Sequence, residues 1–182
     1  MEQAIMRRGA PEAAPFIEIP WEEECVVLYD GDEIETLLPG RAHTLRRAQP
    51  CTAMTFRREA AYDGVAGTGG IELPGGAISG WASFGCRLLS ARRFVRLHAD
   101  ELREGAAAEA ILTRMVRESL ADGFRAAGAG PAGTQAALRA AAWRECHGHA
   151  RDALLRSGWL LTSFKLERLA RSGGENACTR IR

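Results

Sequence analysis

The chain has 182 residues, of which 46% are hydrophobic and 26% are charged, so it has the composition of one ordinary globular domain. Its 24 basic and 23 acidic residues leave a formal net charge of +1. No bulk electrostatic field therefore draws it to nucleic acid or to an anionic membrane, and we expect no nucleic-acid partner.

Residues 1–19 are predicted to form a flexible lead-in, because they contain two prolines, are followed by a third at Pro20, and have no apolar run before Phe16. Such a segment is neither a secretory signal nor a membrane anchor. No later stretch approaches the roughly 20 apolar residues that span a bilayer. The sequence thus predicts a soluble, cytoplasmic protein, while peripheral association with a membrane stays open.

Short strands and tight turns fill the next segment. Asp30-Gly31 and Pro39-Gly40 are turn signals, because glycine accepts the positive φ that these turns require. The predicted strands are Glu24–Tyr29, Glu33–Leu38, His43–Arg47 and Cys51–Arg57. Strands joined by such short turns favour an antiparallel meander.

A glycine-dense stretch, residues 59–77, is predicted to be irregular, and a long strand follows it. In that strand the residues at 78, 80, 82, 84, 86 and 88 alternate with more polar neighbours, so they are expected on the core face. Trp81 then falls on the opposite face, where it is either exposed or covered by helices.

Helical periodicity dominates the rest of the chain. Residues 91–97 suggest a short helix or turn, and residues 106–127 carry apolar side chains at three- and four-residue steps. Thr134 is the expected N-cap of a further helix that ends near Arg156. A final strand, Trp159–Arg168, is predicted to place Leu160, Thr162, Phe164 and Leu166 on one face.

This order predicts an α+β fold in which an antiparallel β meander packs against two to three helices and a C-terminal strand closes the chain. We assign residues 20–170 to the folded domain and residues 171–182 to a polar C-terminal tail.

No catalytic constellation is evident. The glycines of residues 64–76 precede a strand rather than a helix and have no lysine nearby, so they do not match a phosphate-binding loop. The five cysteines are scattered without a CxxC pair, which indicates structural thiols in a reducing compartment. We therefore predict that the protein is not an enzyme and carries no cofactor.

Cys146, His147 and His149 form the densest group of metal-ligating residue types. Cys146 and His149 are three residues apart and share one helix face, but zinc needs three or four ligands and no partner motif is present. A hydrogen-bonded core histidine at position 149 is the favoured reading. A small-molecule or metal-binding domain using this cluster remains the alternative function.

Three residues are candidates for an interface. An exposed tryptophan on a sheet, Trp81, would be a reasonable anchor for a partner, and the pair Arg92 and Arg93 adds positive charge. Without interleaved surface aromatics, the arginine pairs do not indicate nucleic-acid binding.

Two stretches carry a family resemblance, Cys25–Ile34 and Leu38–Leu45, each with its strand and glycine turn. Together with the closing Leu154–Leu169 segment, they resemble the SPFH (band 7, stomatin/prohibitin-like) domain, in particular its soluble virion-core-like bacterial branch. The resemblance covers about residues 20–170 and rests on the order of elements. It implies a non-enzymatic scaffold or adaptor that forms a homo-oligomer or binds a protein partner.

Overall fold

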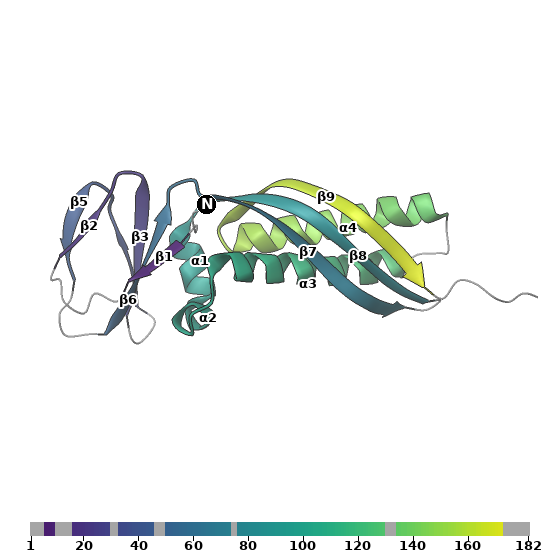
Figure 1. The fold of residues 1–182 in the computed structure, drawn as a ribbon, viewed down its shortest axis with the longest axis horizontal. Coiled ribbons are helices and arrows are strands. Elements are labelled where there is room, and N and C mark those ends of the chain that lie inside the picture. Colours follow the sequence, from purple (N-terminus) through teal and green to yellow (C-terminus); the bar gives the residue numbers. More distant parts are fainter. Residues whose placement is uncertain are drawn as a thin grey trace, which may run out of the picture.

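The computed structural model describes residues 6–9, 16–29, 33–45, 50–73, 76–129 and 134–172. Within these ranges it confirms the α+β class (Figure 1). The strands are β1 (Met6–Gly9), β2 (Phe16–Ile19), β3 (Glu23–Tyr29), β4 (Ile34–Leu37), β5 (Arg41–Thr44), β6 (Cys51–Arg57), β7 (Ala61–Leu73), β8 (Gly76–Leu88) and β9 (Trp159–Ser172). The helices are α1 (Ala91–Leu97), α2 (Ala99–Arg103), α3 (Ala108–Gly128) and α4 (Gln135–Arg156).

The first strands form an N-terminal lobe of two antiparallel sheets. One sheet has the order β1-β6-β3-β4, and β2 pairs with β5 in the other. This pairing differs from a simple meander, because β5 leaves β4 to pair with β2. The strands β1 and β2 also lie within residues 1–19, where the sequence predicts a flexible lead-in. The Asp30-Gly31 turn lies outside the described residues.

The central strand β3 is buried on both faces, which explains its uninterrupted apolar sequence from Cys25 to Tyr29. Val26 and Leu28 belong to the main hydrophobic core, whereas Cys25, Val27 and Tyr29 belong to a smaller cluster on the opposite face. The turn before β5 has the predicted geometry, with Gly40 at φ +69°.

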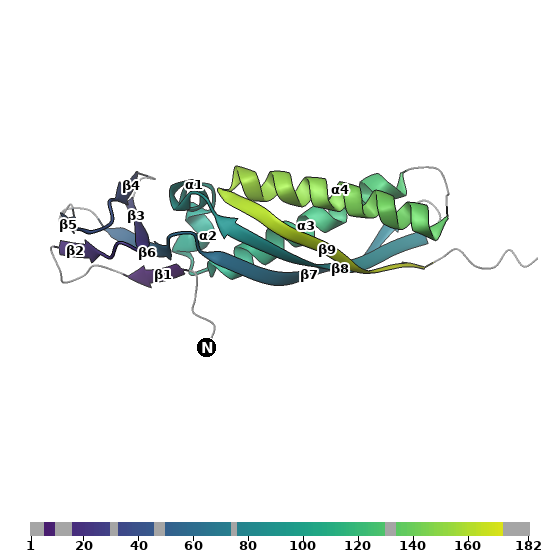
Figure 2. The ribbon, with the colours of Figure 1, turned by 90° about the horizontal axis from the view of Figure 1, so that it is seen from above.

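A second lobe consists of an antiparallel sheet with the order β7-β8-β9, one face of which is covered by α3 and α4 (Figures 1 and 2). The predicted β8 alternation is confirmed, because Ile78, Ala82, Phe84, Cys86 and Leu88 are buried. The predicted α3 stripe is confirmed as well, with Ile111, Leu112, Met115, Val116, Leu120 and Phe124 all in the core. The irregular segment expected at residues 59–77 is instead largely the strand β7.

Two bulges in β9 change which of its side chains face the core, so the prediction for this strand is partly wrong. Gly85 pairs with Ser163 and Cys86 with Leu161, so Thr162 has no partner on β8. Glu167 is skipped in the same way between the Ala82–Leu166 and Trp81–Arg168 pairs. Phe164 and Leu166 therefore do face the core, but Thr162 is exposed and Leu160 lies opposite the exposed Arg87.

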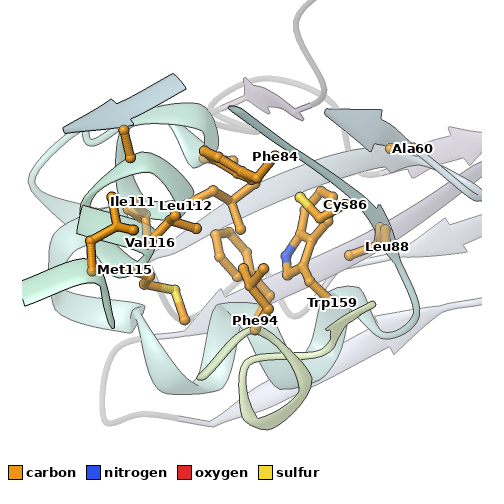
Figure 3. Packing of buried hydrophobic residues seen from close by; sticks show 14 of the residues in the cluster. Ala60, Phe84, Cys86, Leu88, Phe94, Ile111, Leu112, Met115, Val116 and Trp159 are labelled. Carbon is orange, nitrogen blue, oxygen red and sulfur yellow. The ribbon is translucent and has the colours of Figure 1, made fainter. Parts of the chain in front are cut away.

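Helix α1 joins the two lobes through Phe94 (Figure 3). The ring of this buried residue meets Phe56 of β6 at 6.1 Å and Trp159 of β9 at 5.8 Å between centroids, in both cases edge to face. Phe56, Phe94 and Trp159 belong to one hydrophobic cluster that also contains β8 and α3 residues. The core is thus continuous from one lobe to the other.

Candidate interaction surface

The outer face of the β7-β8-β9 sheet is the most distinctive exposed surface of the described chain. No described element covers this face, which we call the open face (Figure 2). Its rows follow the strand register: Asp63, Gly85 and Ser163; Val65, Ser83 and Lys165; and Gly67, Trp81 and Arg168. Directly opposite residues share a face of an antiparallel sheet, so these side chains form one continuous surface.

Trp81 and Val65 provide the apolar part of the open face. Trp81 is 48% exposed and Val65 is 57% exposed. They occupy adjacent strands and adjacent rows, within the diagonal reach of a large side chain. The sequence predicts Trp81 on the face opposite Phe84, and the structure confirms this. It also shows that Trp81 is exposed and not covered by the helices. Val65 was missed because β7 was not recognised as a strand.

The polar part of the open face surrounds Gly85. A Cβ atom at this position would lie 2.6 Å from Oδ1 of Asp63 and 2.7 Å from Oγ of Ser163, so a larger residue would require these side chains to rotate away. A depression of about 360 Å³ lies beside it, lined by Asp63, Gly64, Val65, Ser83, Phe84, Ser163 and Lys165.

Glu167 links the polar groups of neighbouring strands. Its carboxylate accepts a hydrogen bond from Ser83 Oγ at 2.9 Å and pairs with Lys165 Nζ at 2.9 Å. The hydrogen bond from Lys165, followed by that from Ser83, lowers the pKa of Glu167 below its ordinary value. The polar side chains on this part of the open face therefore already bond to one another, whereas Val65 and Trp81 are exposed to solvent.

Arg92 and Arg93 lie on a different surface from Trp81. Both are exposed on α1, and Arg93 donates a hydrogen bond to the Leu155 carbonyl at 3.4 Å. Trp81 lies seven residues before the end of β8, which corresponds to about 23 Å of extended strand. The structure therefore does not bring these three predicted interface residues into one patch.

Cys146, His147 and His149 point in different directions. Cys146 is fully buried against α3 and its thiol contacts the Leu120 carbonyl at 3.7 Å. Its pKa is raised to about 12, chiefly by burial. His147 stacks on Trp143, with 5.0 Å between ring centroids, and touches Phe164. His149 is exposed, so the favoured core-histidine reading is wrong.

The described residues contain no group of three or more His, Cys, Asp or Glu side chains that could hold a metal ion. Within the described residues, the Cys146 cluster therefore lacks the ligand arrangement that a metal site requires.

A charged network that the sequence did not indicate lies where α2 meets α3. Glu101 accepts hydrogen bonds from Arg114 at 2.7 Å and lies 3.0 Å from Nδ1 of the buried His98. Burial raises the pKa of Glu101, but the hydrogen bond from His98 and the contacts with Arg114 together bring it below its ordinary value. These contacts hold α2 against α3, while Nε2 of His98 is buried without a hydrogen-bond partner.

A groove of about 660 Å³ lies at the junction of the two lobes, lined by Trp21, Glu22, Glu24, Arg58, Glu59, Arg87, Leu88 and Leu89. Burial raises the pKa of Glu24, and the nearby Arg58 opposes that shift. Glu59 has a positive φ of 57°, which is uncommon for a residue other than glycine. The groove carries both signs of charge, so its lining does not select one class of ligand.

No family model matches the sequence, and a search of curated proteins finds no match. None of the helices in the described part of the chain is both long and apolar enough to cross a membrane.

Proposed function

We propose that the protein is a non-enzymatic scaffold or adaptor of the SPFH type that acts through self-association or partner binding. The observation that carries this proposal is the open face, where Trp81 and Val65 stand exposed on a sheet that is covered on only one side. Contiguous exposed apolar side chains on a sheet are typical of interaction sites, and tryptophan is enriched among residues that dominate binding energy.

The state of the chemically reactive groups also supports a binding role. Burial raises the pKa of the Cys86 and Cys146 thiols to about 12, so neither is a thiolate nucleophile near neutral pH. His98 is buried beside Glu101, which is held by Arg114. These groups are engaged in packing and in bonds with each other.

The proposal includes a cytoplasmic location. Cys25, Cys86 and Cys146 are buried and form no disulfide within the described structure, as expected of structural thiols in a reducing compartment.

Light scattering coupled to size-exclusion chromatography tests the proposal. We expect the chain, at micromolar concentration, to elute with a mass that is a multiple of its 19.7 kDa. The variant Trp81→Ser should lower that mass, whereas the double variant Arg92→Ala/Arg93→Ala, on a separate surface, should not. A monomer of unchanged mass over the micromolar range would contradict self-association.

A further inference from the structure

The two edge strands of the second-lobe sheet, β7 and β9, differ in how readily another strand could pair with them. Its order β7-β8-β9 leaves the outer edges of β7 and β9 without a partner strand in the described structure. An edge strand presents a row of backbone N–H and C=O groups to which another strand can add, and proteins that stay monomeric block such edges. Of the two edges here, β9 is blocked and β7 is open to pairing with another strand.

The β9 edge is blocked in several ways. Bulges at Thr162 and Glu167 interrupt its regular pairing geometry. The side chain of Arg139, on α4, donates a hydrogen bond to the Leu166 carbonyl at 2.9 Å and so occupies one backbone acceptor. Charged residues Lys165 and Arg168 add to this protection, since charge on an edge strand disfavours pairing.

The β7 edge has no bulge over residues 61–68 and carries less charge there than the β9 edge. This segment pairs with β8 in unbroken register from Ala61–Arg87 to Thr68–Gly80, and the first irregularity follows Thr68. Asp63 is its single charged residue. Four of its eight residues are glycine or alanine, so small side chains leave the backbone accessible to a second strand.

We infer that β7 pairs antiparallel with β7 of a second copy of this chain, about a two-fold axis at Val65. The inference rests on the proposed self-association and names its interface. The two sheets would join into one continuous sheet, with the helices of both copies on the same side. The paired segment is residues 62–68 of each copy, which supplies about six backbone hydrogen bonds between the copies.

The sequence of β7 is self-complementary in this register. Residues whose numbers add to 130 lie opposite one another, so Val65 meets Val65 and Asp63 meets Gly67. Like charges are therefore not opposed. Tyr62, opposite Thr68, and Gly64, opposite Ala66, keep their orientation toward the helices, because even-numbered residues pair only with even-numbered ones.

This pairing also explains the apolar part of the open face. Val65, at 57% exposure, would pack side by side with its counterpart on the axis and lose part of its exposure. Trp81 lies beside Gly67 on the neighbouring strand, so both tryptophans would flank the axis and shield the new backbone hydrogen bonds.

Sedimentation velocity of the full chain and of Val65→Lys tests the inference. Lysine on the axis would face lysine of the other copy, and we expect the association constant to fall at least tenfold. Val65→Thr is the matched control, since it keeps the β-branched shape without charge and should associate nearly as the parent does. Circular dichroism verifies that both variants fold, as expected for an exposed position.

The outcomes separate this inference from the proposed function. A parent chain that is monomeric at all concentrations would overturn the β7 interface and the self-association on which it rests, and would leave only partner binding from the proposed function. A parent chain that associates, together with a Val65→Lys variant that associates equally well, would overturn the β7 interface alone. Loss of association in Val65→Lys but not in Val65→Thr supports both.

Disulfide trapping provides a second, independent readout. A residue on a two-fold axis lies next to itself, so Val65→Cys should form a covalent dimer on mild oxidation. Ser163→Cys, on the blocked β9 strand, is the control and should show no more dimer than the parent chain with its native cysteines. Equal dimer yields from the two variants would overturn the assignment.

Discussion

At the scale of single residues, two glycines on the long helices have opposite packing environments. A Cβ atom on Gly123 of α3 would lie 2.6 Å from the Cα and Sγ atoms of Cys146, so this glycine sets the close approach of α3 and α4. A Cβ atom on Gly148 of α4 would meet no atom within 4 Å. The same substitution should therefore have opposite effects at the two positions.

We expect Gly123→Ala to lower the free energy of unfolding by about 1–3 kcal/mol, because the α4 backbone must move to admit the methyl group. Gly148→Ala should raise it by about 0.5–1 kcal/mol, since alanine favours the helix and meets no obstacle. Urea denaturation followed by circular dichroism measures both. Equal shifts in the same direction would contradict the packing described for Gly123.

The buried thiols give a prediction with a defined pH dependence. Burial raises the pKa of Cys86 and Cys146 from 9.0 to about 12, so the folded protein holds these protons more tightly than the unfolded chain. Their contribution to stability is complete below pH 9 and is lost as the pH rises toward 12.

At pH 8, iodoacetamide should therefore label the half-buried Cys51 well before Cys86 and Cys146. Peptide mass spectrometry of the folded chain at timed intervals measures the order, and labelling in urea gives the reference rates. Labelling of Cys146 as fast as Cys51 in the folded chain would show that the α3–α4 contact opens freely.

Sequence reasoning located some site residues and missed others for identifiable reasons. Trp81 was placed on its face correctly because β8 alternates without interruption from Ile78 to Leu88. His149 was expected in the core because it lies at the margin of the α4 stripe, where a small rotation decides exposure. Arg114 and Glu101 are thirteen residues apart on different helices, so no local pattern could pair them.

At the scale of elements, α1, α3 and α4 were predicted to within a few residues, whereas α2 and β7 were not predicted. Apolar periodicity and the Thr134 cap are local signals, and the structure confirms both. In β7 the glycines at 64, 67, 69 and 70 remove the side chains that would reveal alternation. Its strand conformation comes from pairing with β8, a tertiary effect that intrinsic propensity does not capture.

The α4 cap gives an element-scale prediction. The hydroxyl of Thr134 accepts a hydrogen bond from the Ala137 N–H at 3.2 Å. Thr134→Ala should lower the free energy of unfolding by about 1 kcal/mol, because that N–H loses its acceptor. Thr134→Ser keeps the hydroxyl and should stay within about 0.5 kcal/mol of the parent in the same thermal or urea unfolding assay. A neutral alanine variant would mean that the cap does not stabilise α4.

The β9 bulges illustrate a further limit of pattern reading. Strict alternation predicts Leu160 and Thr162 on the face of Phe164. Because Thr162 is unpaired, the alternation shifts by one residue, so that Leu161 instead of Leu160 lies on the face of Phe164. One extra residue inverts every side chain beyond it, and nothing in the local sequence marks its position. The same bulges block the β9 edge, and the contrast with β7 depends on them.

At the scale of the whole molecule, the two lobes share one core, and Phe94 joins them. Its ring contacts Phe56 in the first lobe and Trp159 in the second. A shared core predicts that the lobes unfold together rather than in sequence. The sequence predicts one domain over residues 20–170, and it did not anticipate the division of the strands into separate sheets.

Phe94→Ala should lower the free energy of unfolding by about 3–5 kcal/mol, because it leaves a cavity between the lobes. Arg92→Ala, exposed on the same helix, should change it by no more than about 0.5 kcal/mol. Tryptophan fluorescence and far-ultraviolet circular dichroism should report coincident transitions for the parent chain. Separate transitions for the two probes would indicate lobes that unfold independently.

The central claim is that the chain associates with itself through the open edge of its second-lobe sheet. Hydrogen–deuterium exchange of the full chain at low and high micromolar concentration tests it directly. We expect the outward-facing β7 amides within residues 61–68 to become more protected as concentration rises, while protection of the β9 edge stays constant. Exchange of β7 at the same rate at every concentration would contradict it.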